Sequence, residues 1–451
     1  MEKVMSDDFF DELFAEPAKV KRLPLNQGQQ AAADGFFAFL MGTDKELNIS
    51  GPGGVGKTFL MGHLIDEIMP QYYDTCKLMG IKPEYNEVVM TATTNKAAEV
   101  LSLNTGRPAS TIHSFLGLKV QDDYESGRSK LTKTKNWTVH RNKIIFIDEC
   151  SMIDTPLRKM ILEGTHSCKI IYVGDHCQLA PVMEVISPIY RSNLPFFELT
   201  EPMRTDKPEL LALNLQLRQT VETGEFKPIQ IVPGIIDHLN GEQMQALVDD
   251  LFIQTESSSR LLAYTNKTVV NYNDYIRELR GLPAKYTVGE ILVNNSAVQV
   301  GKGMISVEQE VTIVELADTT EMVLIEPREK VYLEIIRANL ETSLGEVMVG
   351  VPLPVDRDHH TALVKYYGKC KEWTPYFHLK NTYPDLRPRD SCTVHKSQGS
   401  SYDISLIDLD DLSSCRNPDL AARLLYVGIS RARHRVVFYG DLVEKYGGLI
   451  H

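Results

Sequence analysis

The chain has 451 residues, of which 43% are hydrophobic and 24% are charged, and its formal net charge is −12. This composition is typical of a globular protein with two or more domains, and it excludes a disordered, collagenous or small disulfide-stabilised chain. The acidic balance argues against a protein that coats nucleic acid by bulk positive charge, but it leaves a local basic groove open.

The lengths of the apolar runs and the spacing of the cysteines exclude further classes of protein. Every apolar run is shorter than the roughly 18 residues that a membrane span needs, and the N-terminus lacks the basic and apolar regions of a secretory signal. We therefore expect a cytoplasmic protein without a membrane partner. The seven cysteines are scattered singly with no CxxC pair, which predicts neither a zinc site nor a disulfide framework.

An acidic and aromatic tail, residues 1–24, opens the chain. Phe10 and Phe14 stand at helical spacing among aspartates and glutamates, which favours a short helix that packs on the first domain. The alternative is a docking peptide for a replication or recombination protein.

The strongest motif is residues 51–58, GPGGVGKT, which fits the phosphate-loop pattern G-x-x-x-x-G-K-[ST]. It follows an extended segment, residues 47–50, and opens an apolar pattern of helical period. Glycines let successive backbone N–H groups turn toward phosphates, and the helix N-terminus adds its positive dipole end. The predicted nucleotide site comprises Lys57 for the β and γ phosphates, Thr58 for Mg²⁺, and Gly53, Gly54, Val55 and Gly56 of the loop.

A second motif supplies the acids that Mg²⁺ requires. Residues 144–147 are four apolar residues in a row, typical of a strand buried on both faces, and they lead into Asp148 and Glu149. Asp148 is predicted to bind Mg²⁺ and Glu149 to activate the attacking water. The alternative is a structural pair of acids that caps the next helix. Because no N-K-x-D sequence for reading guanine occurs, ATP is predicted over GTP.

Five further segments follow in a fixed order. They are residues 88–98, 110–114, 174–182, 393–399 and 426–433, with the sequences VVMTATTNKAA, STIHS, GDHCQLAPV, TVHKSQG and YVGISRAR. With the first two motifs, this order resembles the motif set of superfamily 1 helicases over nearly the whole chain. The compact spacing and the TIHS segment are similar to the RecD-like 1B branch, and within it to the phage-encoded Dda-type helicases, which implies the cytoplasm of a host cell.

The resemblance implies further residues at the nucleotide. A guanidinium from a second domain can stabilise the charge of phosphoryl transfer, and it makes hydrolysis depend on domain closure. Arg433 is the rival for one of these finger positions. The implied residues are Gln29 for the adenine edge, Gln178 for the γ-phosphate, Gly399 beside the nucleotide, and Arg204 and Arg431 as arginine fingers.

The resemblance also implies a single-stranded DNA track across two cores. Short hydroxyl, amide and imidazole side chains suit phosphate contacts that must be released at every step. RNA stays open as the physiological substrate, because such a groove reads mainly backbone and stacked bases. The implied track residues are Thr94, Asn95, Thr111, His113, Asn266, Thr393, His395 and Gln398.

The predicted fold is α/β, with two RecA-like P-loop cores, a β-hairpin inserted in the first and an SH3-like β-barrel inserted in the second. Apolar strands that alternate with amphipathic helices predict the cores, and short alternating strands with turns predict the barrel. An aromatic helical stretch, residues 359–383, would form the tower of the Dda-type family. The expected boundaries are core 1 at 25–195, core 2 at 196–280 and 389–451, and the barrel with its tower at 281–388.

The resemblance also implies a strand-separating wedge, a β-hairpin in residues 115–143. Two extended arms, 118–120 and 130–132, would flank a turn at 124–128, and a basic run, 128–143, lies on the returning arm. The run would face phosphates near the fork, and the alternative is a solvated basic face. The tower around Trp373 and Tyr376 would brace the hairpin.

The sequence therefore predicts an ATP- and Mg²⁺-dependent DNA helicase that works as a monomer on single-stranded and forked DNA in replication, recombination or repair. The resemblance implies movement from 5′ to 3′, which no spacing proves. Two alternatives stay open: a RecD-like motor subunit that needs a larger complex, and a non-motor ATPase switch that binds a protein.

Overall fold

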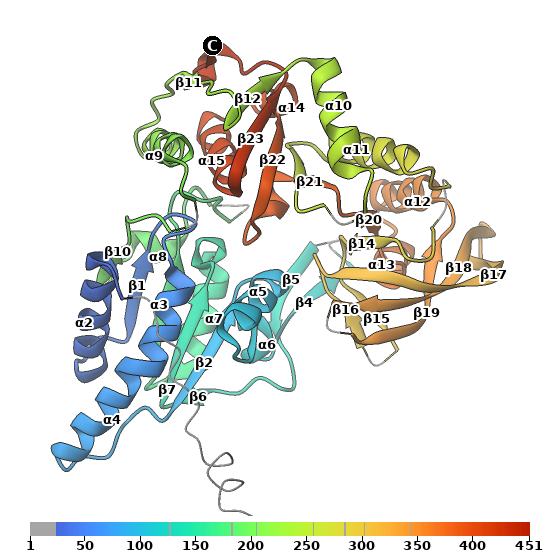
Figure 1. The fold of residues 1–451 in the computed structure, drawn as a ribbon. Helices are drawn as coiled ribbons and strands as arrows, with labels where there is room; N and C mark the ends of the chain where they lie inside the picture. Colours follow the sequence, from blue (N-terminus) through green and yellow to red (C-terminus); the bar gives the residue numbers. More distant parts are fainter. Residues whose placement is uncertain are drawn as a thin grey trace, which may run out of the picture.

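The computed structural model describes residues 24–125, 128–181, 184–203, 205–255, 257–283, 286–301, 303–343 and 345–451 (Figure 1). Nearly all of the predicted tail, the predicted finger Arg204 and the centre of the predicted hairpin turn lie outside these residues. The described chain forms two parallel sheets flanked by helices, and a mainly antiparallel unit beside them. No helix in these ranges is both long enough and apolar enough to cross a membrane.

Core 1 is built on six parallel strands in the order β10-β1-β9-β7-β2-β3. Residues 144–147 of β7 are completely buried, because the sheet is covered on both faces. The strands are β1 (Glu46–Ser50), β2 (Glu87–Ala92), β3 (Ala109–Thr111), β7 (Lys143–Asp148), β9 (Lys169–Gly174) and β10 (Phe196–Glu198), with the short pair β6 (His140–Arg141) and β8 (Thr165–His166) at the side.

The helices of core 1 follow the strands in chain order. A π-helical turn, Leu64–Ile68, joins α3 to α4, and a 3-10 turn, Cys150–Met152, follows β7. The helices are α2 (Gln27–Met41), α3 (Lys57–His63), α4 (Met69–Leu78), α5 (Asn95–Thr105), α6 (Ile112–Phe115), α7 (Thr155–Gly164) and α8 (Pro188–Arg191).

The predicted end of core 1 at residue 195 is three residues too early. All three residues of β10 pair in parallel with β1, from Phe196 opposite Asn48 to Glu198 opposite Ser50. A short apolar strand carries no local signal of the sheet that it joins, because strand pairing is a tertiary choice. Core 1 therefore ends after β10.

Core 2 is built on five parallel strands in the order β12-β23-β22-β13-β21. The chain leaves this core after α11 and returns at β21. The strands are β12 (Ile236–Leu239), β13 (Arg260–Ala263), β21 (Ser391–Thr393), β22 (Tyr402–Asp408) and β23 (Ala432–Tyr439), with the pair β11 (Ile229–Gln230) and β24 (Leu449–Ile450). The helices are α9 (Pro208–Thr223), α10 (Gly241–Phe252), α11 (Asn266–Leu279), α14 (Leu409–Ser413) and α15 (Pro418–Ser430), with 3-10 turns at Val394–Ser397 and Glu444–Tyr446.

The insertion has a hydrophobic core of its own, which includes Leu292, Val311, Leu340 and Val351. Its main sheet is antiparallel in the order β19-β18-β17-β14-β20. β17 and β18 run beyond the predicted strands, because cross-strand pairing holds their exposed, weakly patterned outer halves. The elements are β14 (Ile291–Asn294), β15 (Val298–Val300), β16 (Gly303–Ile305), β17 (Glu310–Glu326), β18 (Val331–Thr342), β19 (Val347–Pro354), α12 (Arg357–Cys370), α13 (Trp373–Thr382) and β20 (Leu386–Pro388).

A buried ion pair lies where the insertion leaves core 2 and returns to it. The guanidinium of Arg280, just after α11, donates to both carboxylate oxygens of Asp390 at 2.8 and 2.9 Å. The two side chains are 9% and 4% exposed, so their charges depend on each other. The pair holds the outgoing and returning chain together at the edge of core 2.

A hairpin of core 1 reaches the insertion (Figure 1). Its antiparallel strands are β4 (Leu118–Asp123) and β5 (Arg128–Lys133), longer than the two predicted arms. Tyr124 follows β4, and its ring centroid lies 4.8 Å from that of Phe377 in α13. The hairpin and the helical pair of the insertion therefore touch.

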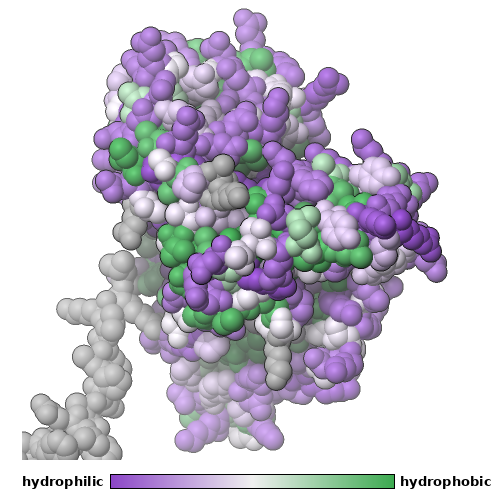
Figure 2. Space-filling view, turned by 90° about the vertical axis from the view of Figure 1, so that its right-hand side faces the viewer, coloured by the Kyte–Doolittle hydropathy of each residue, from purple (hydrophilic) through white to green (hydrophobic). Residues whose placement is uncertain are grey.

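The surface on the insertion side carries both hydrophilic and hydrophobic side chains. Figure 2 shows hydrophobic side chains gathered in patches within a mainly hydrophilic surface. Exposed large apolar residues of the insertion include Met322 and Val349. Single exposed apolar side chains are normal on folded proteins.

Candidate functional site

Several residues predicted for the nucleotide and for DNA lie at one edge of the core 1 sheet, because parallel strands bring their carboxyl ends together. The phosphate loop follows β1, Gln178 follows β9 and Asp148 ends β7, and these three strands are neighbours. Thr94 follows β2 and Thr111 ends β3, at the far end of the same edge. The sheet order thus separates the predicted nucleotide residues from the predicted DNA residues.

The phosphate loop is shaped by glycines. Gly54 and Gly56 have φ values of 88° and 77°, which residues with side chains rarely adopt. A Cβ on Gly51 would lie 2.5 Å from a backbone oxygen just after β10, so only glycine fits. Nζ of Lys57 donates to the backbone oxygens of Gly51 and Pro52 at 2.7 and 3.0 Å. The ammonium therefore lies at the loop, where a phosphate oxygen would compete for it.

Asp148 and Glu149 form a strained turn at the end of β7. Glu149 has a φ of 53°, and its N–H donates to Oδ1 of Asp148 at 2.9 Å. Oγ1 of Thr93 donates to the backbone oxygen of Glu149 at 3.1 Å. Desolvation raises the pKa of Asp148 to about 7, with Glu149 adding to the rise and Lys57 opposing it. This carboxylate and the Thr58 hydroxyl are the hard oxygen ligands that Mg²⁺ prefers, so the residues fit the ion.

Core 2 meets this edge through residues 398–399. Nε2 of Gln398 lies 3.5 Å from Oε1 of the buried Gln178. Gly399 has a φ of 76°, and a Cβ there would lie 4.0 Å from Oε1 of Glu149. The sequence predicts Gln398 for the DNA track, whereas the structure places its amide beside the predicted γ-phosphate sensor. The loop after β21 turns toward core 1, which motif order alone does not reveal.

Gln29 connects α2 to the phosphate loop. Its side chain is completely buried, and Nε2 donates to the backbone oxygen of Val55 at 3.1 Å. Its Oε1 accepts the N–H of Asn26 at 3.1 Å, which completes a capping box at the start of α2. Gln29 thus lies at the predicted nucleotide site, with both polar atoms engaged by the protein.

The two candidate fingers in residues 426–433 are held within core 2. Arg431 is 1% exposed, and its guanidinium donates to a backbone oxygen of α15 at 3.2 Å, to the backbone oxygen of Ser400 at 3.4 Å and to Oγ of Ser430 at 3.0 Å. Arg433 is half exposed and pairs with Asp403 at 3.4 Å. Their contacts in this structure do not include the phosphate loop.

A cavity of about 250 Å³ separates the phosphate loop from this segment. Its lining includes Pro52 and Gly53 on core 1, and Ser430 and Ala432 on core 2. Arg431 stands between Ser430 and Ala432 in the sequence, and its own guanidinium is held by acceptors of core 2.

A second cavity lies where the three units meet. Asn266 and Thr393, which are predicted track residues, line it. Its cations were not predicted as site residues, although two of them, Lys96 and Lys396, lie within the motifs at residues 88–98 and 393–399. The cations are Lys96 from core 1, Arg260 and Lys396 from core 2, Arg387 of β20 and Arg389 just after β20, and they share the cavity with Asn295, Glu308 and Glu310.

The other predicted track residues are divided between structural and exposed positions. Oγ1 of Thr94 caps α5 and Oγ1 of Thr111 caps α6, each by accepting a backbone N–H at 3.1 Å. Burial lowers the pKa of His113, with Asp154 opposing the change. Asn95 and His395 are exposed.

Glu308 is an acid within the cationic cavity. It precedes β17 with a φ of 64°. Desolvation raises its pKa, and the charges of Lys396 and Lys96 oppose the rise. The carboxylate therefore lies near the two lysines that a nucleic acid phosphate would approach.

The predicted basic run, residues 128–143, is partly neutralised by acids. The partners lie on β4, on α7 and on β2, which the sequence could not bring together. The pairs are Lys130 with Asp123, Lys133 with Glu163, and Lys143 with Glu87. Lys130 and Lys133, whose side chains are 67% and 40% exposed, fit a solvated face better than a phosphate contact, whereas the Lys143 side chain is only 19% exposed.

Comparisons with known proteins give the family. Residues 24–228 match the AAA domain model, and residues 391–439 match the UvrD-like helicase C-terminal domain model. The chain is 25% identical over 460 residues to the ATP-dependent DNA helicase dda of Enterobacteria phage T4, covering 92% of this chain and 99% of that protein. It is 22% identical to the RecBCD enzyme subunit RecD of Haemophilus influenzae, covering 87% of this chain and 66% of that protein. The chain belongs to the superfamily 1B helicases.

The fold of this helicase is also that of Pif1. A structure of Bacteroides Pif1 in complex with ADP-AlF3 and ssDNA matches with a TM-score of 0.52 and 14% identity, covering 95% of each chain. A Pif1 structure that describes unwinding at forked dsDNA matches with a TM-score of 0.50 and 16% identity, again covering 95% of each chain. These likenesses show an α/β fold with two RecA-like cores.

Lys57→Ala should abolish ATP turnover and leave the affinity for single-stranded DNA close to wild type. The reason is that Nζ lies at the phosphate loop, whereas the cationic cavity lies at the junction of the three units. ATP hydrolysis and fluorescence anisotropy with a labelled oligonucleotide measure the two effects. Lys77→Ala, on the exposed face of α4, is the control. An equal loss of both properties in Lys57→Ala would contradict two separate sites.

Glu308→Gln should tighten single-stranded DNA binding about threefold to tenfold, because it removes a negative charge beside Lys96 and Lys396. The measurement is the Kd of an oligonucleotide at low salt and alkaline pH, because a raised pKa makes the carboxyl lose its charge as the pH falls. Glu329→Gln, exposed between β17 and β18, changes the net charge equally and is the control. If both variants bind alike, the effect is one of net charge and Glu308 does not face the strand.

Proposed function

We propose that this helicase moves from 5′ to 3′ along single-stranded DNA, with ATP bound between its two cores. The observation that carries the proposal is that both cores line both candidate sites. Residues 398–399 of core 2 approach Gln178 and Glu149 of core 1 at one of them. At the other, Lys96 of core 1 faces Lys396 of core 2 across the cationic cavity. A movement of the cores that closes one site would therefore also change the distance between the cores at the other site.

In this proposal the residues of core 1 bind and activate the nucleotide. Lys57 and the loop amides hold the phosphates, and Glu149 accepts the proton of the attacking water. Thr58 and Asp148 would hold Mg²⁺, which supplies charge neutralisation at the phosphates when bound. Arg431 would turn from its acceptors in core 2 toward the phosphates as the cores close, with Arg204 as the second finger and Gln29 next to the base.

The track would run through the cationic cavity. Its cations come from three different units, so a bound strand neutralises charges that otherwise repel one another. Asn266 and Thr393 add neutral donors, and the exposed Asn95 and His395 extend the same surface. A track read through backbone contacts suits a motor that acts on any sequence.

Strand displacement with tailed duplexes tests this function. The purified chain should unwind a duplex with a 5′ single-stranded tail when Mg²⁺ and ATP are present, and a 3′-tailed duplex much more slowly. Unwinding of only the 3′-tailed substrate would reverse the proposed polarity. DNA-stimulated ATPase without unwinding would favour a subunit of a larger complex, and ATPase without DNA stimulation would favour a non-motor switch. A matched RNA tail separates the two nucleic acids.

We propose in addition that the hairpin β4–β5 is the wedge that splits the duplex. Tyr124 lies against Phe377, which itself contacts Trp373 and Tyr376 with ring centroids 6.4 and 4.9 Å away. This aromatic cluster would hold the tip rigid against the load of an unpaired base pair. The insertion, with its SH3-like sheet and the tower α12 and α13, would serve as the brace.

Tyr124→Ala should lower the rate of duplex unwinding about tenfold, the effect of losing one aromatic pair of up to roughly 1.5 kcal/mol. DNA-stimulated ATPase and translocation on single strands should stay near wild type, because the hairpin is apart from both cavities. Tyr366→Ala, a similarly exposed tyrosine on α12, is the control. Normal unwinding by Tyr124→Ala would put the wedge elsewhere, and loss of all three activities would make the hairpin structural.

A further inference from the structure

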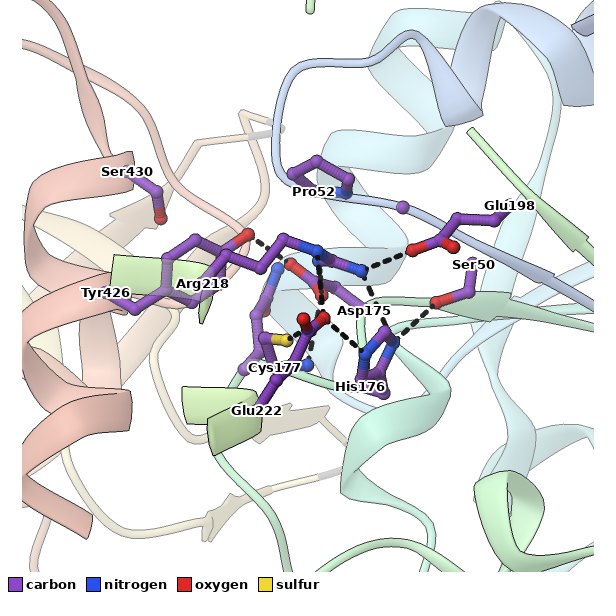
Figure 3. Close-up of polar contacts among 12 residues, drawn as sticks. Ser50, Pro52, Asp175, His176, Cys177, Glu198, Arg218, Glu222, Tyr426 and Ser430 are labelled. Carbon is purple, nitrogen blue, oxygen red and sulfur yellow. Dashed lines mark hydrogen bonds and ion pairs between the residues drawn. The ribbon is translucent and has the colours of Figure 1, made fainter. Parts of the chain in front are cut away.

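Asp175 is a buried carboxylate of core 1 that accepts the N–H of Cys177 at 3.0 Å and, in addition, hydrogen bonds from two side chains of core 2 (Figure 3). Arg218 of α9 donates through Nη1 to Oδ1 at 2.7 Å, and the hydroxyl of Tyr426 of α15 donates to Oδ2 at 2.6 Å. Burial by itself would raise the pKa of Asp175, but the charges of Arg218 and Lys57 hold it below its ordinary value. One ionised group is therefore shared by both cores.

Arg218 also bridges the two strands that flank the phosphate loop. Its Nη2 donates to Oε1 of Glu198 at 2.7 Å. Asp175 follows β9 and Glu198 ends β10, and in the sheet register Ser50 stands between Gly174 and Glu198. Ser50 is the last residue before the phosphate loop. A guanidinium carried by core 2 thus spans the base of that loop.

The loop after β9 is held by core 2 along its length. Nη1 of Arg423, on α15, donates to the backbone oxygens of His176 and Gln178 at 2.7 and 2.5 Å. The side chains of Cys177 and Leu179 are buried in the hydrophobic core of core 2. The predicted γ-phosphate sensor Gln178 therefore stands in a loop whose position follows core 2.

We propose that Tyr426 and Arg218 are positioning residues that transmit a movement of core 2 to Gln178 and to the phosphate loop. Separating a buried carboxylate from its donors costs several kcal/mol, so this link stays closed while the cores move. A shift of α9 and α15, such as DNA on core 2 would produce, then moves the loop after β9. The inference rests on the proposed function, because it explains how DNA accelerates hydrolysis.

Tyr426→Phe tests the link, because it removes one donor to Asp175 and keeps the ring. The matched control is Tyr446→Phe: the Tyr446 hydroxyl donates to the backbone oxygen of Cys415 at 2.6 Å, entirely within core 2. The measurements are kcat and KM for ATP with and without oligo-dT, the Kd for oligo-dT, and the melting temperature. In Tyr426→Phe the ratio of DNA-stimulated to basal kcat should fall about tenfold, the effect of losing a hydrogen bond to a charged group. In Tyr426→Phe the KM for ATP and the Kd for oligo-dT should stay near their wild-type values. In Tyr446→Phe the ratio of DNA-stimulated to basal kcat should stay at the wild-type value.

Two results would overturn the inference. A wild-type ratio in Tyr426→Phe would mean that the link does not transmit movement. An equal fall in both variants, in step with their melting temperatures, would mean a merely structural role. Asp175→Asn, which removes the shared charge, should lower the ratio further than Tyr426→Phe does, and a smaller effect would contradict the network. Absence of DNA stimulation in the wild-type protein would instead reject the proposed function on which the inference rests.

Discussion

The carboxyl edge of the core 1 sheet is the feature around which this helicase is organised. Because all six strands run in parallel, the loops after β1, β7 and β9 meet without any long connection between them. Buried apolar strands hold this edge rigid, and the polar groups stand only where the strands stop. The strained backbone of Glu149 fits this design, since a non-glycine residue at a φ of 53° persists only where its surroundings determine it.

The lysines and the arginine proposed to bind ATP or DNA donate hydrogen bonds to protein acceptors in this structure. Lys57 donates to carbonyls of its own loop, Arg431 donates to groups of core 2, and Lys396 donates to Asn295. A buried or half-buried cation without acceptors would be costly. Phosphate binding is therefore an exchange of acceptors, and the side chains must turn when ATP or DNA arrives. Such an exchange links ligand binding to motion between the units.

The insertion depends on a chain that leaves core 2 and returns to the same place. The buried pair of Arg280 and Asp390 fixes that place, and it thereby fixes where Arg387 and Glu308 meet the cores. The hairpin of core 1 touches the same unit through Tyr124. The cationic cavity and the proposed wedge thus both rely on the attachment of one inserted unit.

The sequence by itself determined the parts whose chemistry is local. The phosphate loop needs consecutive glycines followed by Lys57, and an acidic pair after an apolar strand needs no distant partner to be recognised. The parallel cores followed from the periodic patterns of apolar residues. Only the tertiary structure decided which sheet β10 joins and which acids pair with the basic run. It also decided that Gln398 lies beside Gln178, and that Asp175 accepts hydrogen bonds from α9 and α15. Each of these depends on which residues meet across long stretches of chain, and no spacing within one segment encodes a partner that another segment supplies.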